Sequence, residues 1–213
     1  SSTIPECIGT MTNLTNVAMH ANRLDGSIPE SLGNLIHLET LYLDNNKLTH
    51  SIPSSIGNLP GMSILTMFSN RLTGPIPSGI WDMWSLLYLY LDNNHLTGLL
   101  PNFSTPITAV HVNLSANHLH GTIPATIANY QQLVVLGLAA NLFTGTIPVS
   151  LATLPLASLQ LSENSLTGTI PKTFAKLVVL QEMFLRNNRL TGNLDGVVNA
   201  TLQSVLNTVQ VEN

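Results

Sequence analysis

The sequence contains little charge. Only 8% of its 213 residues are Asp, Glu, Lys or Arg, against about 25% in an average soluble protein. The formal net charge of −4 argues against nucleic acid as a partner, because a nucleic-acid-binding protein needs a basic footprint. Asn and Thr supply most of the polarity, with 22 residues of each. We therefore expect a surface built mainly from neutral polar groups.

Cysteine is nearly absent, since Cys7 is the only one in the chain. A disulfide within the chain is impossible, and Cys7 is either a free thiol or the partner of a cysteine outside it. The sequence also lacks an apolar run of about 18 residues, so it predicts no transmembrane segment. No signal peptide is visible.

The sequence is instead rich in self-similarity. LYLDNNKLTH at 41–50 recurs as LYLDNNHLTG at 89–98, with eight identical residues in ten. One Asn anchors each copy of a unit of 23 or 24 residues, and these anchors are Asn22, Asn46, Asn70, Asn94, Asn117, Asn141, Asn164 and Asn188. Apolar residues around each anchor complete the pattern L-x-x-L-x-L-x-x-N-x-L, although Leu142 stands one position early in the sixth copy.

Each part of this pattern predicts an element of structure. The alternation L-x-L predicts a short strand with one buried face, and one strand per unit predicts a parallel sheet. The anchor Asn follows the strand, where a buried side chain can satisfy backbone groups that the turn leaves unpaired. Glycines such as Gly26 and Gly74 then permit the next bend.

The second half of the unit is also repeated, as GSIPESLGNL at 26–35 and GTIPATIANY at 121–130. On these motifs, nearly the whole chain resembles the plant-type extracellular leucine-rich-repeat family. The resemblance implies an α/β repeat fold, a curved right-handed solenoid with a parallel β-sheet on the concave face and short 3₁₀ turns on the convex face. It also implies a second short strand at the Ile-Pro segment and an extracellular or cell-surface location.

Residues 1–213 are expected to form a single solenoid segment of about eight repeats. Residues 3–14 resemble the second half of a repeat without its first half, and residues 205–213 resemble the strand of a ninth unit. The Cys-bearing caps of the family are missing, and a solenoid needs polar caps to stay soluble. We therefore expect both ends to be cut in mid-repeat and the chain to be part of a longer protein or assembly.

Catalytic constellations are missing as well. The histidines and acidic residues form no H-E-x-x-H spacing, and there is no glycine-rich phosphate loop. His118 and His120 come nearest to a metal pair. The positions equivalent to His118 in earlier repeats form a cationic column that opposes a metal, and they are Arg23, Lys47, Arg71 and His95. We predict no enzymatic activity, cofactor or metal.

The residues between the buried leucines of each strand are free to specify a ligand. In repeats two to five they include rings and carboxylates: Tyr42, Asp44, Phe68, Tyr88, Tyr90, Asp92 and His111. Exposed aromatic rings offer contact area at little entropic cost, so this patch predicts a site for a protein, peptide or glycan. Alternatively, the rings stack across the strands and stiffen the sheet. Repeats six and seven look bare, with Gly137 and Ala139 at these positions.

Glycosylation is indicated by four N-x-S/T sequons, at Asn13, Asn102, Asn113 and Asn199. Asn113 is expected on the concave face beside His111, where a glycan would crowd the predicted ligand site.

Two functions follow from these observations. The first is a non-enzymatic extracellular recognition module, either a receptor ectodomain or a secreted binding protein. The alternative is a glycosylated structural segment of a cell-surface or extracellular-matrix assembly that packs against other chains. Columns of threonine such as Thr73, Thr97 and Thr144 are compatible with an ice-binding ladder, but they also follow from the family's L-T-G phrase.

Overall fold

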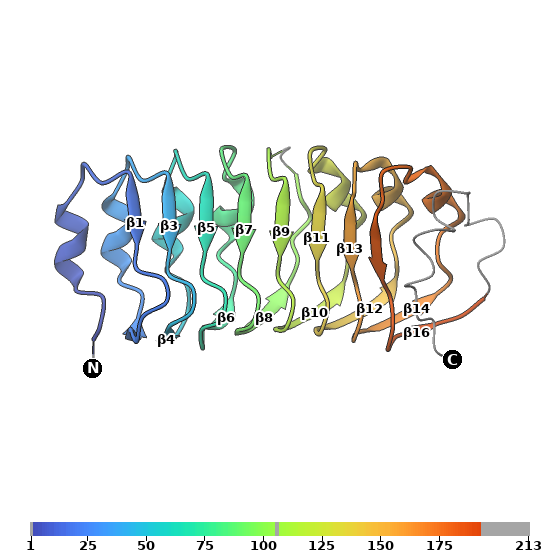
Figure 1. The fold of residues 1–213 in the computed structure, drawn as a ribbon, viewed down its shortest axis with the longest axis horizontal. Coiled ribbons are helices and arrows are strands. Elements are labelled where there is room, and N and C mark those ends of the chain that lie inside the picture. Colours follow the sequence, from blue (N-terminus) through green and yellow to red (C-terminus); the bar gives the residue numbers. More distant parts are fainter. Residues whose placement is uncertain (1, 105–106, 193–213) are drawn as a thin grey trace.

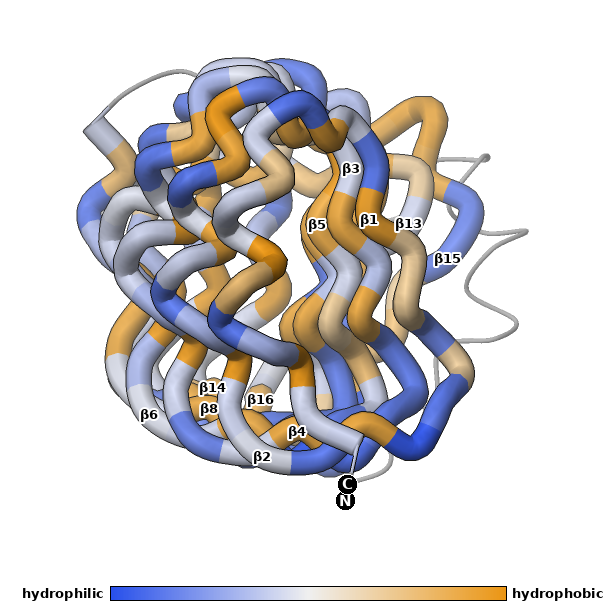
Figure 2. The backbone as a smooth tube through the Cα atoms, turned by 90° about the vertical axis from the view of Figure 1, so that its left-hand side faces the viewer, coloured by the Kyte–Doolittle hydropathy of each residue, from blue (hydrophilic) through white to orange (hydrophobic). Residues whose placement is uncertain are grey.

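The chain winds into a solenoid, which a computed structural model describes for residues 2–104 and 107–192. The coils follow one another along the long axis of the molecule (Figure 1). Figure 2, turned by 90°, shows a large sheet on one side and the strands of a second sheet along the bottom. The 3₁₀ turns close the coil on the side opposite the large sheet. This arrangement confirms the predicted solenoid.

In the described part of the chain, the large sheet has eight parallel strands in sequence order. They are β1 (Asn16–Ala18), β3 (Thr40–Tyr42), β5 (Ile64–Thr66), β7 (Tyr88–Tyr90), β9 (His111–Asn113), β11 (Val135–Gly137), β13 (Ser158–Gln160) and β15 (Glu182–Phe184). Equivalent residues of neighbouring repeats pair without a shift, as Leu65 does with Leu89. The central residue of each strand is buried, so the two flanking side chains point out of the sheet.

Among the described residues, further parallel strands of two to five residues form the bottom of the coil in Figure 2. Six of them make one sheet: β6 (Thr73–Pro75), β8 (His95–Leu99), β10 (His118–Thr122), β12 (Leu142–Thr146), β14 (Ser165–Gly168) and β16 (Arg189–Leu190). β2 (Asp25–Ser27) pairs with β4 (Lys47–Thr49) separately. The expectation that the Ile-Pro segment forms these strands is wrong, because β10 ends at Thr122, before Ile123 and Pro124. Proline lacks the N–H that a continuing ladder requires, and the one proline in these described strands, Pro75, is the last residue of β6.

Within residues 2–104 and 107–192, seven 3₁₀ turns cover the remaining side, and each follows a proline. They are η1 (Glu6–Thr10), η2 (Glu30–Asn34), η3 (Ser54–Asn58), η4 (Ser78–Asp82), η5 (Ala125–Asn129), η6 (Val149–Thr153) and η7 (Lys172–Lys176). Each proline is extended, as Pro124 is with φ −72° and ψ 138°, a conformation that the fixed φ of proline favours. Every helical segment among the described residues is of this 3₁₀ type.

The core is a continuous column of apolar side chains that no single coil can bury alone. Leu41, Leu43 and Leu48 show how one repeat contributes three fully buried residues. In the sixth repeat the buried residue is Phe143, whereas Leu142 is 55% exposed. The expectation that Leu142 takes the core position one residue early is therefore wrong; the register is kept, and an aromatic ring replaces leucine.

The anchor asparagines form the predicted ladder. Asn70 donates from Nδ2 to the carbonyl oxygens of Leu43 and Met67, both at 3.0 Å. Its Oδ1 accepts the N–H of Leu48 at 3.0 Å. One side chain thus joins two neighbouring coils, and the same bonds recur at Asn94, Asn117 and Asn141.

A candidate ligand-binding face on the large sheet

The outward residues of the large sheet form two rows that cross all eight strands. One row contains Ala18, Tyr42, Thr66, Tyr90, Asn113, Gly137, Gln160 and Phe184. The other contains Asn16, Thr40, Ile64, Tyr88, His111, Val135, Ser158 and Glu182. Because pairing is unshifted, residues that are about 24 positions apart in sequence become neighbours in these rows.

Three of the predicted site residues form one aromatic cluster on β7 and β9. The rings of Tyr88 and Tyr90 stack with centroids 6.4 Å apart. His111 packs edge-on against Tyr88 at 5.1 Å, and its Nδ1 lies 2.8 Å from the phenol oxygen of Tyr90. All three side chains are half-buried. They therefore stiffen the sheet and also present ring surface, so both predicted roles are compatible with their positions.

The electrostatics of the cluster favour neutral groups. Burial, followed by the negative charges of Tyr88 and Asp92, raises the pKa of Tyr90 above 10.0. Burial is also the main reason that the pKa of Asp92 is raised above its ordinary value of 3.8, with a smaller contribution from Asp44. Hydrogen bonds from its own backbone and from Asn93 act in the opposite direction.

The other predicted site residues lie apart from this cluster. Tyr42 contacts His20 instead, with ring centroids 5.8 Å apart, and β5 separates it from Tyr90. Phe68 follows β5 and is half-buried. Asp44 is only 6% exposed, because its carboxylate accepts hydrogen bonds from Thr66 Oγ1 and Asn45 Nδ2, at 2.5 and 2.9 Å. Asp44 therefore presents little surface to a ligand.

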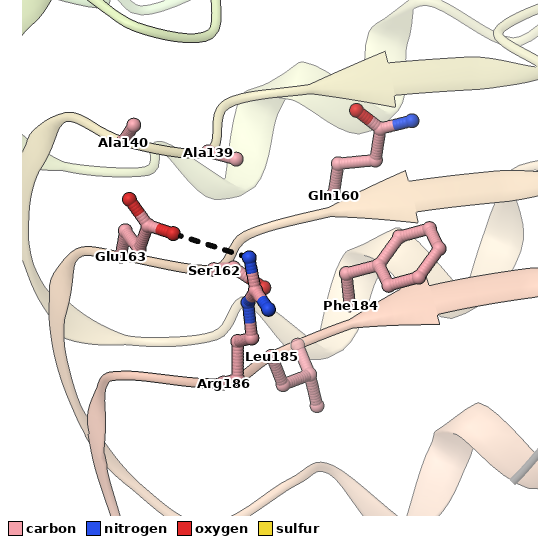
Figure 3. Close-up of a pocket in the computed structure, with 8 residues that line it drawn as sticks. All are labelled: Ala139, Ala140, Gln160, Ser162, Glu163, Phe184, Leu185 and Arg186. Atoms are coloured by element: carbon pink, nitrogen blue, oxygen red, sulfur yellow. Dashed lines mark hydrogen bonds and ion pairs between the residues drawn. The ribbon is translucent and has the colours of Figure 1, made fainter. Parts of the chain in front are cut away.

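A hollow of about 380 Å³ lies further along the same face (Figure 3). Gln160 and Phe184 enter it from β13 and β15, and Phe184 is 37% exposed. Arg186 and Glu163 form an exposed ion pair of 3.4 Å across its edge. Its remaining walls come from small side chains and one leucine, namely Ala139, Ala140, Ser162 and Leu185. The Oγ atom of Ser162 is buried without a hydrogen-bond partner among the described residues.

Sequence reasoning placed no ligand site at this hollow. The sequence did contain an indication of this site, because Phe184 and Arg186 occupy the same positions in their repeat as Tyr90 and Asp92 do in theirs. The small residues of repeats six and seven were interpreted as a bare region. In the structure these small side chains leave the space that makes the hollow.

Three of the four sequons fall within the described residues, and Asn199 lies outside them. Asn13 and Asn102 are exposed and lie outside the strands. Asn113 lies between the aromatic cluster and the hollow, where its Oδ1 accepts the Ser115 N–H at 3.1 Å and contacts Gly137. The hydroxyl of Ser115 is buried and has no hydrogen-bond partner among the described residues.

The cysteine and the potential metal ligands of the described residues form no metal site. Cys7 is exposed and unpaired. Among residues 2–104 and 107–192, no three His, Cys, Asp or Glu side chains are grouped closely enough to hold a metal ion. The same residues contain no helix with the length and apolar character needed to cross a membrane.

Family models for the leucine-rich repeat match residues 12–72 and 131–190, and a second such model matches residues 85–105. The chain belongs to the leucine-rich-repeat family. A comparison with curated proteins finds no match. The repeats of this chain therefore have to be interpreted from the structure and from similar solved structures.

Two similar solved structures match most of this chain, and one of them is the ectodomain of a plant receptor kinase. A crystal structure of PEPR1–AtPEP1 has a TM-score of 0.85 and 35% identity, covering 90% of this chain and 27% of that one. The leucine-rich-repeat ectodomain of the Arabidopsis receptor kinase HAESA, in complex with an IDA peptide hormone, has a TM-score of 0.84 and 31% identity. That match covers 89% of this chain and 32% of the HAESA chain. The present chain thus spans about a third or less of these two proteins.

A plant ice-binding protein is also similar, with a TM-score of 0.69 and 25% identity, covering 90% of this chain and 70% of that one. The threonine columns of the present chain lie on the second sheet and are interrupted by Pro75, Leu99 and His120. Thr144 and Thr167 donate their hydroxyls to backbone carbonyls of the preceding coil, at 3.2 and 3.3 Å. These hydroxyls are therefore already bonded within the protein.

Proposed function

We propose that this leucine-rich-repeat chain is an extracellular recognition module that captures an extended peptide across its large sheet. The observation that carries the proposal is the arrangement of one face. The aromatic cluster of Tyr88, Tyr90 and His111 lies on β7 and β9. The hollow around Phe184 and Arg186 lies at β13 and β15 on the same face. Between them, Gly137 of β11 has no side chain of its own, and Oδ1 of Asn113 lies over it.

The distance between the two positions suits a short peptide. Tyr90 and Phe184 lie in the same row, separated by four steps from β7 to β15. At about 4.8 Å per strand, this separation is about 19 Å. An extended chain advances about 3.3 Å per residue, so about six residues span it.

The two positions offer different chemistry to such a peptide. The cluster presents half-buried rings, which suit an apolar or aromatic side chain. The hollow presents the Gln160 amide and the exposed Arg186–Glu163 pair, which suit polar or charged groups. One apolar anchor and several polar contacts fix both the position and the direction of a bound segment.

Similar structures support this proposal. The HAESA ectodomain was crystallised with a peptide hormone, and it shares the solenoid of the present chain over most of this chain's length. Neither the proposed site nor its chemistry requires catalysis or a cofactor. An extracellular or cell-surface location agrees with the ectodomain neighbours and with the four sequons, which we propose as glycan acceptors.

The test uses a displayed library of random peptides, selected on the full 213-residue chain. Selected peptides are then measured against Tyr90→Ala, Phe184→Ala and the double variant. Each single variant is expected to weaken binding about tenfold or more, since buried aromatic anchors commonly contribute over 1 kcal/mol. Thr97→Ala, an exposed change on the second sheet, is the matched control. A library that yields no binders, or binders that tolerate the double variant, contradicts the proposal.

The structural alternative has its own observation in its favour. Large apolar side chains are exposed on the edge where the 3₁₀ turns lead into the large sheet, including Ile36 at 56%, Trp84 at 67% and Val178 at 63%. Such residues can pack against other chains. Sedimentation of the glycosylated chain distinguishes the two functions. Self-association that Trp84→Ser abolishes would favour the structural segment, whereas a monomer that binds selected peptides favours the recognition module.

A further inference from the structure

A second groove lies outside the large sheet, in the loops that lead from the 3₁₀ turns into β1, β3, β5 and β7. These loops run along the upper edge of the solenoid in Figure 1. The groove has a volume of about 400 Å³ and shares no lining residue with the hollow beside Phe184. The proposed peptide site therefore does not use it.

Part of the groove lining is apolar and exposed. Ile36, Pro60 and Trp84 occupy equivalent positions in three successive repeats, so they form a row along this edge. Ile36 is 56% exposed and Trp84 is 67% exposed. Gly61 also lines the groove and adds no side chain to it. An exposed ring beside aliphatic groups is a surface that a partner of suitable shape covers.

Bonds between coils hold the backbone of this row. Ser85 donates from Oγ to the carbonyl oxygen of Pro60 at 3.3 Å, and Thr108 donates from Oγ1 to that of Trp84 at 2.9 Å. The groove is therefore preformed, and an occupant does not have to order the backbone beneath it.

The groove is also lined by a glycosylation sequon. Asn13 and Thr15 belong to the sequon Asn13-Leu14-Thr15, and both line the groove and are exposed. Asn13 lies in a turn in which the N–H of Leu14 donates to the carbonyl oxygen of Met11 at 3.0 Å. Among the described residues, no hydrogen bond engages the side chain of Asn13 or Thr15. A glycan acceptor thus lies in the groove itself, with its side chains accessible.

We propose that an N-linked glycan on Asn13 folds along this groove and packs a sugar ring on the indole of Trp84. The inference rests on the glycosylation proposed above and adds the surface that holds the glycan. N-linked glycans begin with N-acetylglucosamine, and the C–H-bearing face of such a sugar is apolar and packs on an exposed ring. Its hydroxyl and acetamide groups pair with the imidazole of His37 and the carboxylate of Glu39, which are exposed and line the same groove.

The span of the groove matches an oligosaccharide rather than a single sugar. Asn13 and Trp84 come from the first and fourth repeats, three steps apart along the stack. At about 4.8 Å per strand, the separation is about 14 Å. The sugar attached to Asn13 therefore lies beside Ile36 and His37, and a later sugar of the same glycan reaches Trp84.

The covalent attachment favours the glycan over a second copy of the chain as the occupant. A glycan on Asn13 is tethered within the groove, so its effective concentration there is on the order of millimolar. A second copy has no such tether, and it would have to displace the attached sugars before it could contact Trp84.

The test compares the full chain, produced in glycosylating cells, with variants that lack one sequon. Peptide mapping first gives the occupancy of Asn13, and an unoccupied Asn13 overturns the inference. Thr15→Ala removes this sequon, whereas Thr15→Ser keeps it. Ser104→Ala is the matched control, because it removes the sequon of Asn102, which does not line the groove. Thr15 and Ser104 are both exposed, so each change should preserve the fold.

Acrylamide quenching of tryptophan fluorescence measures the cover over Trp84. The other tryptophan, Trp81, is 6% exposed and contributes little quenching. We expect the quenching constant of Thr15→Ala to be at least about twofold that of the parent, because a packed sugar shields an exposed ring. Thr15→Ser and Ser104→Ala should match the parent. Equal quenching in Thr15→Ala and the parent overturns the inference.

The ring of Trp84 should also shift the resonances of the sugar that it contacts. In a chain with an isotope-labelled glycan, some C–H protons of the Asn13 glycan are expected upfield of their positions in the released glycan. This shift should persist in Trp84→Phe and disappear in Trp84→Ser. A shift that persists in Trp84→Ser would overturn the contact with Trp84.

Two further outcomes separate this inference from the functions proposed above. Self-association of the glycosylated parent that Trp84→Ser abolishes would show that a second copy occupies the groove, and it would overturn the inference. Selected peptides should bind Thr15→Ala and Trp84→Ser as they bind the parent, because neither residue belongs to the aromatic cluster or to the hollow beside Phe184. Failure of the peptide site therefore leaves the glycan result unchanged, and the reverse also holds.

Discussion

The phenol oxygen of Tyr90 lies 2.8 Å from Nδ1 of His111, across the boundary between β7 and β9. This contact fixes two rings of the aromatic cluster, which forms one end of the proposed peptide site. It also places the phenol where burial and the charges of Tyr88 and Asp92 raise its pKa above 10.0.

This raised pKa predicts a loss of stability in alkali. The unfolded chain releases the Tyr90 proton at the ordinary pKa, whereas the folded chain retains it to higher pH. The stabilisation is therefore present below pH 10 and is lost as the pH rises through the folded-state value. Denaturation followed from pH 9 to 12, near the ordinary tyrosine range, should show a smaller fall for Tyr90→Phe than for the parent chain. An identical fall in both proteins contradicts the assignment.

The asparagine ladder predicts a large cost for a central substitution. Asn117 is 4% exposed, and its side chain bonds the carbonyls of Leu91 and Leu114 and the N–H of Leu96. Asn117→Ala leaves these buried groups unpaired and should lower the free energy of unfolding by about 3 kcal/mol or more. Denaturant unfolding measures the change.

Asn22 supplies the matched control for this experiment. It is exposed in the first repeat, and its Nδ2 bonds the carbonyls of Met19 and His20 within its own coil. Asn22→Ala should therefore cost less than about 1 kcal/mol. Equal losses at both positions would show that the ladder does not stabilise the stack.

The stacking of the 3₁₀ turns predicts a different pair of substitutions. A Cβ atom on Gly57 would stand 2.7 Å from the Cα atom of Gly79 in the neighbouring turn, and backbone cannot move aside cheaply. Gly57→Ala should lower stability by about 1–3 kcal/mol, as overpacking does. Gly61→Ala is the control, because the nearest atom to its Cβ would be the Leu38 oxygen at 3.8 Å. Thermal unfolding of both variants tests the comparison, and similar melting temperatures would contradict it.

Asn113 predicts a conflict between glycan and peptide, since it lies between the aromatic cluster and the hollow. We expect chains with a glycan on Asn113 to be depleted from the fraction that a selected peptide retains. Ser115→Ala removes the sequon, and it should preserve the fold because the Ser115 hydroxyl has no bonding partner among the described residues. Ser115→Thr keeps the sequon as the control. Intact mass of the retained and unretained fractions gives the result, and equal glycan content in both would exclude this path for the peptide.

Much of the fold followed from local rules. The spacing of leucine and asparagine predicted the strands, the parallel sheet and the ladder, because each depends on a residue's position within one coil. Two expectations at the same level were wrong. The second strand precedes the Ile-Pro pair, and Phe143 rather than Leu142 fills the core of the sixth repeat. A further regularity was not predicted: the residue before each anchor Asn has a positive φ, from 52° at Ala140 to 58° at Glu163.

The candidate site could be predicted only in part. Tyr88, Tyr90 and His111 were recognised, because their ring chemistry is visible in the sequence and their columns are adjacent. The burial of Asp44 was not, since it depends on Thr66 in the next coil. The hollow beside Phe184 was missed for a related reason: a cavity is made by what small side chains leave empty, and a sequence pattern registers only what is present.

The sequence by itself determined the repeat, the buried positions and the outward columns, because these follow from the periodicity of a chain that turns the same way about eight times. Tertiary structure alone decided which outward residues act together. The large sheet pairs its strands without a shift, so Tyr90 and Asn113 become neighbours, as do Gln160 and Phe184. Contacts between coils, and the space between side chains, depend on this register and on the depth of burial, which no single repeat contains.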